Sequence, residues 1–475
     1  MLTTLIIVYL VLALWAIFSI FLYGSRPSRS IAWLFIVVAL PVFGVFLYVL
    51  FGINRKRFKF FTLNRLSKRR LYDINNKEEL IDEFQHNFKG SKYEALGKLL
   101  LESSGFPAVD GNEVELLHDG KSAFEAIFEA VKNAKSFIHL QYYIIEKGEV
   151  LDELASLLDE KLKEGVEVRI IYDAIGSYSW KNEAIFQLKK SGAKVFSILP
   201  INIKTILSTI NYRNHRKLVI IDGDVAFTGG VNITDKYINA DESAMGIWED
   251  IHMKIEGPAV DHLHRIFIKD YYFASDEKLL ADKKFLPHHK NEGNHLVQVV
   301  AGGPDLENSA ILHQYVMMIH SAEKKIQIQN PYFIPNKNLI ESLKMAALRG
   351  VEVFIMVPKQ NDSIIAKYSM YSNFEELLKV GVKICVVSEH FFHSKLIIID
   401  NCMASVGSGN FDYRSFEHNY ELNVLLYDEK ISQELSSNFE ELCETSNHLK
   451  YESYKDRPLK DKILQGMAKI FSPLL

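Results

Sequence analysis

Two nine-residue segments, NHRKLVIID (residues 214–222) and FHSKLIIID (residues 392–400), carry the same pattern, His-x-Lys-x-x-x-x-Asp. The β-branched, apolar run after each lysine predicts a buried strand. Residues i and i+2 of a strand point to the same face, so each histidine is expected beside its lysine. Each aspartate follows its histidine at an odd offset and is expected on the opposite face, in a supporting role. The catalytic candidates are His215, Lys217, Asp222, His393, Lys395 and Asp400.

Two histidines beside two lysines suit the breaking and remaking of a phosphodiester, because one imidazole can act as nucleophile and the other as acid and base. Glycines and an asparagine follow each predicted strand, and Asn232 and Asn410 are expected to donate to a phosphoryl oxygen. Zinc favours closely grouped His, Cys or carboxylate ligands, whereas a lysine two residues from a histidine repels a cation. No metal site is therefore expected.

The two patterns lie in matched parts of a duplicated body. VELL (residues 114–117) corresponds to VQVV (297–300), and GVEVRIIYD (165–173) corresponds to GVEVFIMVP (350–358). Strands that alternate with helices of about 10–15 residues predict α/β units. We expect two similar lobes, residues 110–285 and 290–452, joined by a charged linker near 276–294 and preceded by a connector over 55–109.

Two apolar runs, residues 2–23 and 31–53, open the chain. Each is long enough to cross a hydrocarbon core of about 30 Å, and the polar turn SRPSRS separates them. They predict a two-helix transmembrane hairpin over residues 1–54; a cleaved signal peptide is disfavoured because a basic first region is absent. Basic residues concentrate after the second run, between Arg55 and Arg70, so the body and both termini are expected in the cytoplasm, on a multi-pass protein of the inner or plasma membrane.

The net charge and the cysteines give further information on partners and on redox state. The net charge of −4 is too near neutral to favour a nucleic-acid partner. The odd number of cysteines, Cys385, Cys402 and Cys443, and their wide spacing predict reduced, mostly buried thiols.

In these motifs the chain resembles the phospholipase D superfamily and, within it, the bacterial cardiolipin synthases. The paired His-Lys-Asp patterns are specific for the superfamily, and the apolar hairpin and the C-terminal residues narrow the likeness to cardiolipin synthase. The further matching segments are IYDAIGS (171–177), WED (248–250), NPYFIP (330–335), GSGNFDYRS (407–415), NYE (419–421), YVLFGIN (48–54) and SPLL (472–475).

The resemblance implies an α/β fold, in which two α/β/α sandwich lobes pack around one active site at their interface. It maps the acidic partners of the histidines to Asp250 and Glu421, which lie 35 and 28 residues after His215 and His393. A carboxylate that accepts from one imidazole nitrogen fixes its tautomer. His252, two residues after Asp250, is expected to be structural.

The implied activity joins two phosphatidylglycerol molecules into cardiolipin and releases glycerol. By family analogy His215 forms a phosphohistidine and His393 moves the protons, with neither ATP nor another cofactor. The expected partners are therefore phosphatidylglycerol and cardiolipin in the membrane. Two alternatives stay open: a hydrolase of the phospholipase D type, and a phosphatidylserine synthase that uses CDP-diacylglycerol.

The C-terminal segment, residues 453–475, predicts an amphipathic helix. Its apolar side chains near one face are Leu459, Ile463, Met467, Ile470 and Phe471. Such a helix either lies on the membrane surface or packs on the body. The sequence leaves open the acyl-chain preference, the use of phosphatidylethanolamine and the oligomeric state.

Overall fold

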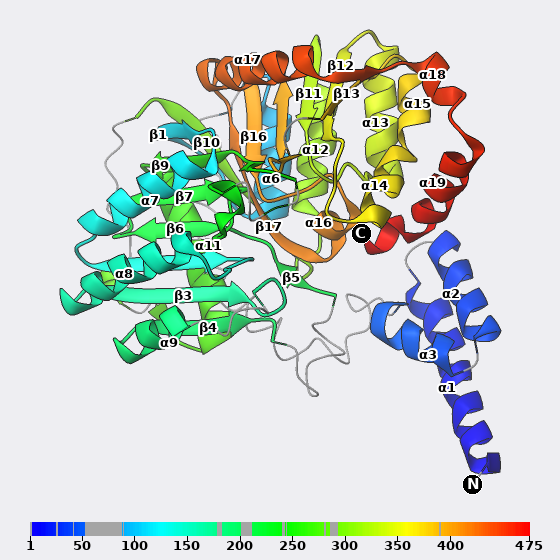
Figure 1. The fold of residues 1–475 in the computed structure, drawn as a ribbon, viewed down its shortest axis with the longest axis horizontal. Coiled ribbons are helices and arrows are strands. Elements are labelled where there is room, and N and C mark those ends of the chain that lie inside the picture. Colours follow the sequence, from blue (N-terminus) through cyan, green and yellow to red (C-terminus); the bar gives the residue numbers. More distant parts are fainter. Residues whose placement is uncertain are drawn as a thin grey trace. The chain divides into compact units, whose positions relative to one another are not determined.

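The computed structural model describes residues 2–24, 27–40, 42–52, 88, 90–177, 183–200, 211–239, 243, 245–279, 282–285, 293–388 and 391–475 (Figure 1). The chain divides into two units: Met1–Asp73 with Leu199–Arg213, and Ile74–Ile198 with Asn214–Leu475. The first unit holds the apolar N-terminal helices, and the second holds both His-Lys motifs.

One helix of the first unit is long and apolar enough to cross a membrane, among the residues that the structure describes. It is α1 (Leu2–Tyr23), and its segment Ile6–Tyr23 has a mean hydropathy of 2.6. The second apolar run is not the single helix that we expected. It is divided into α2 (Pro27–Ala39), α3 (Phe43–Leu47) and the π-helix η1 (Tyr48–Gly52).

The division has a local cause. Val42, just before α3, has a φ of 65°, which no right-handed helix contains, and the sequence places a proline at position 41, where no amide hydrogen is available. The parts still contact α1 and one another. The hydroxyl groups of Ser19 in α1 and Tyr48 in η1 lie 2.9 Å apart, and the rings of Trp33 in α2 and Tyr48 meet edge to face at 5.7 Å.

A mixed β-sheet forms the centre of the second unit, and its strand order is the same in the two halves of the sequence. The first half has the order β4-β3-β2-β6-β7-β9-β1, and the second half has the order β13-β12-β11-β15-β16-β17-β10 with β18 at the outer edge. In each half the first three strands are parallel and the others pair antiparallel.

The strands of the first half are β1 (Ala108–Leu117), β2 (Phe137–Tyr142), β3 (Glu167–Asp173), β4 (Lys194–Ile198), β6 (Leu218–Ile221), β7 (Val225–Gly229) and β9 (His252–Glu256). Those of the second half are β10 (His295–Gly302), β11 (Lys325–Gln329), β12 (Glu352–Pro358), β13 (Lys383–Val387), β15 (Leu396–Ile399), β16 (Met403–Gly407), β17 (Asn419–Leu426) and β18 (Asn447–Leu449). Three two-residue strands complete the set: β5 (Arg213–Asn214), β8 (Trp248–Glu249) and β14 (Phe391–Phe392).

Strand β1 joins the halves. Its C-terminal residues, from Glu113 to Leu117, pair with β9 of the first half, and its start, from Ala108, pairs antiparallel with β10 of the second. The register shifts between Val109 and Asn112, so one strand changes partner along its length. The two halves therefore share one continuous path of strands.

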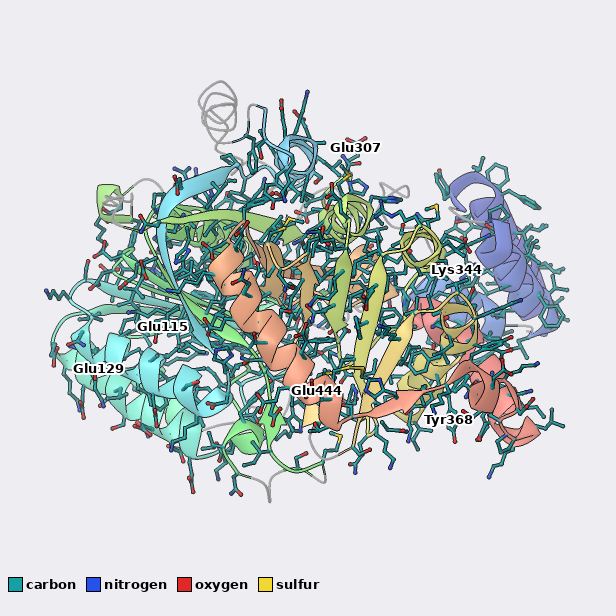
Figure 2. The ribbon with its side chains drawn as sticks, turned by 90° about the horizontal axis from the view of Figure 1, so that it is seen from above. Glu115, Glu129, Glu307, Lys344, Tyr368 and Glu444 are labelled. Atoms are coloured by element: carbon teal, nitrogen blue, oxygen red, sulfur yellow. A yellow bond between two sulfur atoms is a disulfide. The ribbon has the colours of Figure 1, made fainter. Side chains whose placement is uncertain are left out.

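Helices cover both faces of the strands in each half, as the alternation of β2 and β11 shows. Ile138 and Leu140 of β2 belong to the core formed with α7 and α8, whereas His139 between them stacks on Phe267 of α11. In β11, Ile326 and Ile328 face the core formed with α12 and α13. The intervening Gln327 accepts a hydrogen bond from Ser436 of α17, the helix whose C-terminal end Glu444 marks in Figure 2.

Among the described residues, this unit has the helices α6 (Glu94–Ser104), α7 (Gly120–Asn133), α8 (Glu149–Lys163), α9 (Glu183–Lys190), α11 (Ala259–Ser275), α12 (Ala310–Ser321), α13 (Lys337–Leu348), α14 (Ile364–Tyr371), α15 (Phe374–Leu378), α16 (Tyr413–Glu417), α17 (Glu429–Thr445), α18 (Tyr451–Lys455) and α19 (Leu459–Phe471). Short 3-10 turns are η2 (Asp235–Tyr237), η5 (Lys283–Phe285) and η6 (Ser472–Leu474). Turn η5 falls within the expected linker, and its Phe285 is buried against Phe137.

The cysteines differ from the expectation of three free thiols. Cys385 of β13 and Cys443 of α17 form a disulfide, with their Cα atoms 5.8 Å apart, and Cys402 is free and buried. A separation of 58 residues hides this proximity in the sequence, because it arises only when α17 packs across the strands of the second half.

Candidate active site

His215 lies just before β6 and is held by the second half of the chain. Its backbone N–H donates to the carbonyl of Tyr420 at 2.9 Å. Its Nδ1 lies 3.0 Å from a carboxylate oxygen of Glu421 and 3.0 Å from the carbonyl oxygen of Ser408. Burial lowers the pKa of His215, and the charge of Glu421 opposes that shift.

Three side chains fix the Glu421 carboxylate. The hydroxyl of Ser408 donates to Oε2 at 2.5 Å, while Ser415 and the amide of Asn419 donate to Oε1, each at 3.0 Å. Burial alone raises the pKa of Glu421, but His215, Lys217 and the hydrogen bond from Ser408 lower it below its usual value. The group therefore stays a carboxylate and orients the imidazole.

His393 is held in the corresponding way by the first half. It follows β14, which pairs in parallel with β8, and its backbone N–H donates to the carbonyl of Glu249 at 2.6 Å. Its Nδ1 lies 2.9 Å from a carboxylate oxygen of Asp250 and 3.3 Å from the hydroxyl of Tyr237. Burial and then Lys395 lower the pKa of His393 to about 3, although Asp250 opposes the shift.

The two carboxylates are thus exchanged between the halves of the sequence. Glu421 contacts the histidine 206 residues before it, and Asp250 contacts the histidine 143 residues after it. The sequence identified both carboxylates through their segments WED and NYE, but a spacing measured within one half does not reveal this exchange. The exchange ties the two motifs into one cluster.

The two lysines lie beside their histidines, although both residues of each pair come just before the strand rather than on it as expected. The Nζ of Lys217 donates to the carbonyl of His215 at 2.7 Å, and the Nζ of Lys395 lies 2.8 Å from Nδ1 of His393 and also contacts its carbonyl. Burial, followed by the charge of Lys395, lowers the pKa of Lys217 to about 7. Burial lowers that of Lys395 to about 8.

Two buried ammonium groups that act on one another favour a bound anion. An anion between them would restore the usual pKa of both lysines, because an opposite charge stabilises the protonated form. A divalent cation at the same place would be repelled by both. The electrostatics of the cluster thus suit a phosphate group.

The asparagines lie around the same cluster. Asn232 accepts a hydrogen bond from the backbone N–H of Ile144 at 3.2 Å. It also interacts with the hydroxyl of Tyr237, where it partly offsets the rise in pKa that burial causes. That hydroxyl contacts Asp250. Asn410 is buried, and its side-chain oxygen has no hydrogen-bond partner in the part of the chain that the structure describes.

One of the glycines in this region has a clear steric cause. A Cβ atom on Gly230 would come within 1.9 Å of a carboxylate oxygen of Asp250, so a larger residue there would displace the partner of His393.

Asp222 and Asp400 are not part of this cluster, and their grouping with the catalytic candidates requires correction. Asp222 accepts hydrogen bonds from the backbone N–H groups of residues 135–137, and Asp400 accepts them from residues 323–325. Both strands end one residue earlier, and both aspartates have a positive φ, 56° and 52°. They hold the turn after the strand to the start of the neighbouring strand, which agrees with a supporting role.

Sequence reasoning missed several aromatic and hydroxyl neighbours. Tyr143 meets the ring of His215 edge to face at 4.9 Å, and Tyr332 meets that of His393 at 6.2 Å. Ser408 and Ser415 lie within the quoted segment GSGNFDYRS, so their position was signalled although their role was not. Tyr237 carries no such signal, because it lies on a 3-10 turn outside every motif.

His252 is buried on β9, and neither of its ring nitrogens has a hydrogen-bond partner among the described residues. Burial lowers its pKa to about 4, so it is neutral at physiological pH.

The duplicated strand order, with one His-Lys pair from each half in a single buried cluster, defines a protein of the phospholipase D-like class. A family model described as "Cardiolipin synthase, PLD-like domain" matches residues 127–271 and 315–443, and one described as "Phospholipase_D-nuclease N-terminal" matches residues 11–52. The chain belongs to the cardiolipin synthase family and is a phosphatidyltransferase.

Relatives span nearly the whole chain. A cardiolipin synthase of Geobacillus sp. (strain WCH70) is 36% identical over 96% of this chain and 91% of its own length. A cardiolipin synthase of Alkalihalophilus pseudofirmus is 34% identical over 100% of this chain and 94% of its own. Among solved structures, a phosphatidylserine synthase of Haemophilus influenzae shares the fold, with a TM-score of 0.59 at 16% identity over 81% of this chain and 100% of that chain.

Proposed function

We propose that the protein transfers a phosphatidyl group from one phosphatidylglycerol to another, forming cardiolipin and releasing glycerol through a phosphohistidine. Two lobes, residues 110–285 and 290–452, contribute one His-Lys pair each to a single active site. The observation that carries this proposal is the exchanged pairing of His215 with Glu421 and of His393 with Asp250.

The surroundings of Nδ1 support His215 as the nucleophile. This nitrogen faces two acceptors, the Glu421 carboxylate and the Ser408 carbonyl, so it carries the hydrogen and leaves the lone pair on Nε2. Nδ1 of His393 faces the Asp250 acceptor and also the ammonium of Lys395, which donates. The tautomer of His215 is therefore fixed more strongly than that of His393.

In the first step, Nε2 of His215 attacks the phosphorus of one phosphatidylglycerol, and the bond from phosphorus to the headgroup glycerol oxygen breaks. His393, which must enter this step as the protonated imidazolium, donates a proton to that oxygen, and glycerol leaves. In the second step, His393 takes a proton from a headgroup hydroxyl of the second phosphatidylglycerol. The new oxygen–phosphorus bond forms as the bond to His215 breaks, so one phosphodiester replaces another without ATP.

Lys217, Lys395, Asn232 and Asn410 surround the nonbridging oxygens in this proposal. Preorganised donors aimed at developing charge are among the largest catalytic contributions, and losing one costs about 10²–10³ in rate. The buried, partner-free oxygen of Asn410 fits an amide whose partner arrives with the substrate, through its NH₂ group or through a bridging hydroxyl.

For the N-terminal unit we propose a two-helix hairpin in the inner or plasma membrane. α1 forms one arm, and α2, α3 and η1 together form the other. The basic residues between 55 and 70, which lie outside the described residues, then favour a cytoplasmic body and cytoplasmic termini.

The test uses the purified full chain with phosphatidylglycerol as its sole lipid. Cardiolipin and free glycerol in equal amounts are the expected products. Phosphatidic acid instead of cardiolipin would identify a hydrolase, and a requirement for CDP-diacylglycerol with serine would identify a phosphatidylserine synthase; either result would overturn the proposal. The double variant His215→Ala/His393→Ala is the control for a contaminating activity.

A further inference from the structure

Two helices of the second half form an exposed apolar surface outside the two His-Lys motifs. Helices α14 and α19 pack against each other, and both labels appear in Figure 1. Ile364 and Ile470 are each 75% exposed, values that are unusual for isoleucine in a folded body. The α14–α19 surface consists of Ile364, Ile365, Leu459, Ile463, Met467, Ile470 and Phe471.

Helix α19 is firmly attached through its other side, so the exposure does not come from loose packing. Gln465 and Ala468 are buried against the body. Arg457, just before the helix, donates to Gln465 and to Glu375 of α15, and the hydroxyl of Ser472, just after it, lies 2.6 Å from that of Ser369. One side of α19 packs on the body, and the apolar side is left toward solvent.

The charges beside this surface suit an anionic partner. Glu375 pairs with Arg457, and Glu376 pairs with Lys469, which leaves these acids neutralised. Lys367, Lys460 and Lys462 form no ion pair with another residue in the described part of the chain. Exposed apolar side chains flanked by free lysines are the composition of helices that bind anionic bilayers.

The start of this surface is also connected to the active site through side-chain contacts. Helix α14 is capped by Ser363, and the residue before it, Asp362, accepts a hydrogen bond from the hydroxyl of Tyr332 at 2.7 Å. The ring of Tyr332 meets that of His393. Two contacts thus connect the start of the apolar surface to a catalytic imidazole, and Tyr368 of α14, labelled in Figure 2, lies on the same helix.

We propose that the α14–α19 surface binds the face of an anionic phospholipid bilayer and holds the active-site entrance against the headgroups. A second copy of the chain is a less suitable occupant, because a symmetric contact would bring lysines of like charge together. The binding itself does not depend on the proposed reaction; only its effect on turnover rests on the proposed function.

A dye on Ile470→Cys in the full-length protein, reconstituted in vesicles, reports the contact. Cys402 is buried and the other two cysteines are bonded, so labelling is selective. The matched control is Leu348→Cys, which is 71% exposed but ends α13 at the opposite end of β12 from α14, about 20 Å away. Bromine-bearing phosphatidylglycerol should quench the dye at 470 and leave the dye at 348 unchanged.

Equal quenching at both positions, or none at position 470, would refute the proposal. Quenching without cardiolipin formation would instead leave the docking intact and reject the proposed function. A change in mass by light scattering that accompanies Ile470→Glu, without quenching of the dye at 470, would identify a self-association face and also refute the proposal.

Kinetics supply an independent measurement. Ile463→Glu/Ile470→Glu should lower kcat/KM on bilayer phosphatidylglycerol about tenfold or more and leave the rate on dispersed short-chain phosphatidylglycerol within about twofold. Leu348→Glu should change neither rate. Lys460→Gln/Lys462→Gln should lower the bilayer rate by about fivefold per lysine at low salt and less at high salt. Equal losses on both substrates would contradict docking.

Discussion

The two histidine sites come from copies of one sequence motif, yet their surroundings differ. The carboxylate of Glu421 receives hydrogen bonds from three side chains, those of Ser408, Ser415 and Asn419. The carboxylate of Asp250 receives the hydroxyl of Tyr237 at 3.3 Å and one backbone N–H, that of Ile251 at 2.9 Å. The difference arises in the neighbours of each carboxylate, which come from the same half of the chain as that carboxylate.

This inequality teaches how a duplicated site can divide one reaction between two similar imidazoles. A nucleophile needs a fixed tautomer with a free lone pair, and the surroundings of His215 provide it. A group that alternately gives and takes a proton benefits from a neighbour that changes its proton affinity. The ammonium of Lys395, 2.8 Å from Nδ1 of His393, is such a neighbour.

Replacing the histidines should have the largest effect and should separate the two roles. Both His215→Ala and His393→Ala should lower cardiolipin synthesis by about 10⁴-fold or more, because each step needs both groups. Phosphatidylglycerol labelled in its phosphate should leave a covalent adduct on the His393→Ala protein, whose intermediate forms and decays slowly. An adduct trapped on the His215→Ala protein would show that the assignment is reversed.

Replacing the carboxylates should have the second-largest effect: Glu421→Gln and Asp250→Asn should each lower the rate of cardiolipin synthesis by up to about 10⁴-fold. Glu421 contacts the proposed nucleophile, so Glu421→Gln should mainly slow formation of the adduct. Asp250 contacts the histidine that moves a proton in both steps, so Asp250→Asn should slow both formation and decay of the adduct. Rapid-quench measurement of adduct and of released glycerol separates these steps. Normal formation of the adduct with Glu421→Gln, or normal decay of the adduct with Asp250→Asn, would contradict the exchanged pairing.

Sequence reasoning identified the strands, the His-Lys neighbours and, through the family resemblance, both carboxylates. It did not identify which carboxylate serves which histidine, because that depends on how the halves meet at β8 and β14 rather than on a local period. The disulfide was missed because its cysteines meet only when α17 packs across the strands of the second half. The second apolar run was read as one helix because hydropathy averages over a break that the backbone makes at Val42.

Replacing a lysine should have the next-largest effect: Lys217→Met should lower the rate of cardiolipin synthesis by about 10²–10³-fold. The pKa of Lys217, about 7 in the folded protein against a usual 10.5, also predicts a sign for stability. Between these values the unfolded chain binds a proton that the folded chain lacks, so the ligand-free protein becomes more stable as pH rises from about 7 to 10. Below pH 7 both states are protonated and the dependence ends.

Thermal unfolding in detergent at several pH values measures this slope, and Lys217→Met is its control. The variant should have a higher Tm than the wild type at pH 7 and a flatter dependence on pH, since it removes a buried charge. A bound anionic lipid should flatten the wild-type slope by raising the pKa of the lysine. An identical slope in wild type and variant would assign the dependence to other groups.

The smallest effect on catalysis is expected at Asp222 and Asp400, although both belong to the same sequence pattern as the catalytic histidines and lysines. Each carboxylate accepts three backbone N–H groups at the start of the neighbouring strand. The aspartates follow the C-terminal ends of β6 and β15, whereas the histidines precede the N-terminal ends of these strands. Asp222→Asn should therefore lower the free energy of unfolding by about 1–3 kcal/mol while kcat of the folded protein stays within about twofold. Denaturant unfolding and the rate per folded molecule measure the two quantities, with Asp224→Asn, one turn further on and outside this hydrogen-bond set, as the matched control. A 10²-fold loss of kcat at unchanged stability would show that Asp222 takes part in catalysis. The whole His-Lys-Asp motif would then be catalytic, and the aspartate would do more than hold the turn to the neighbouring strand.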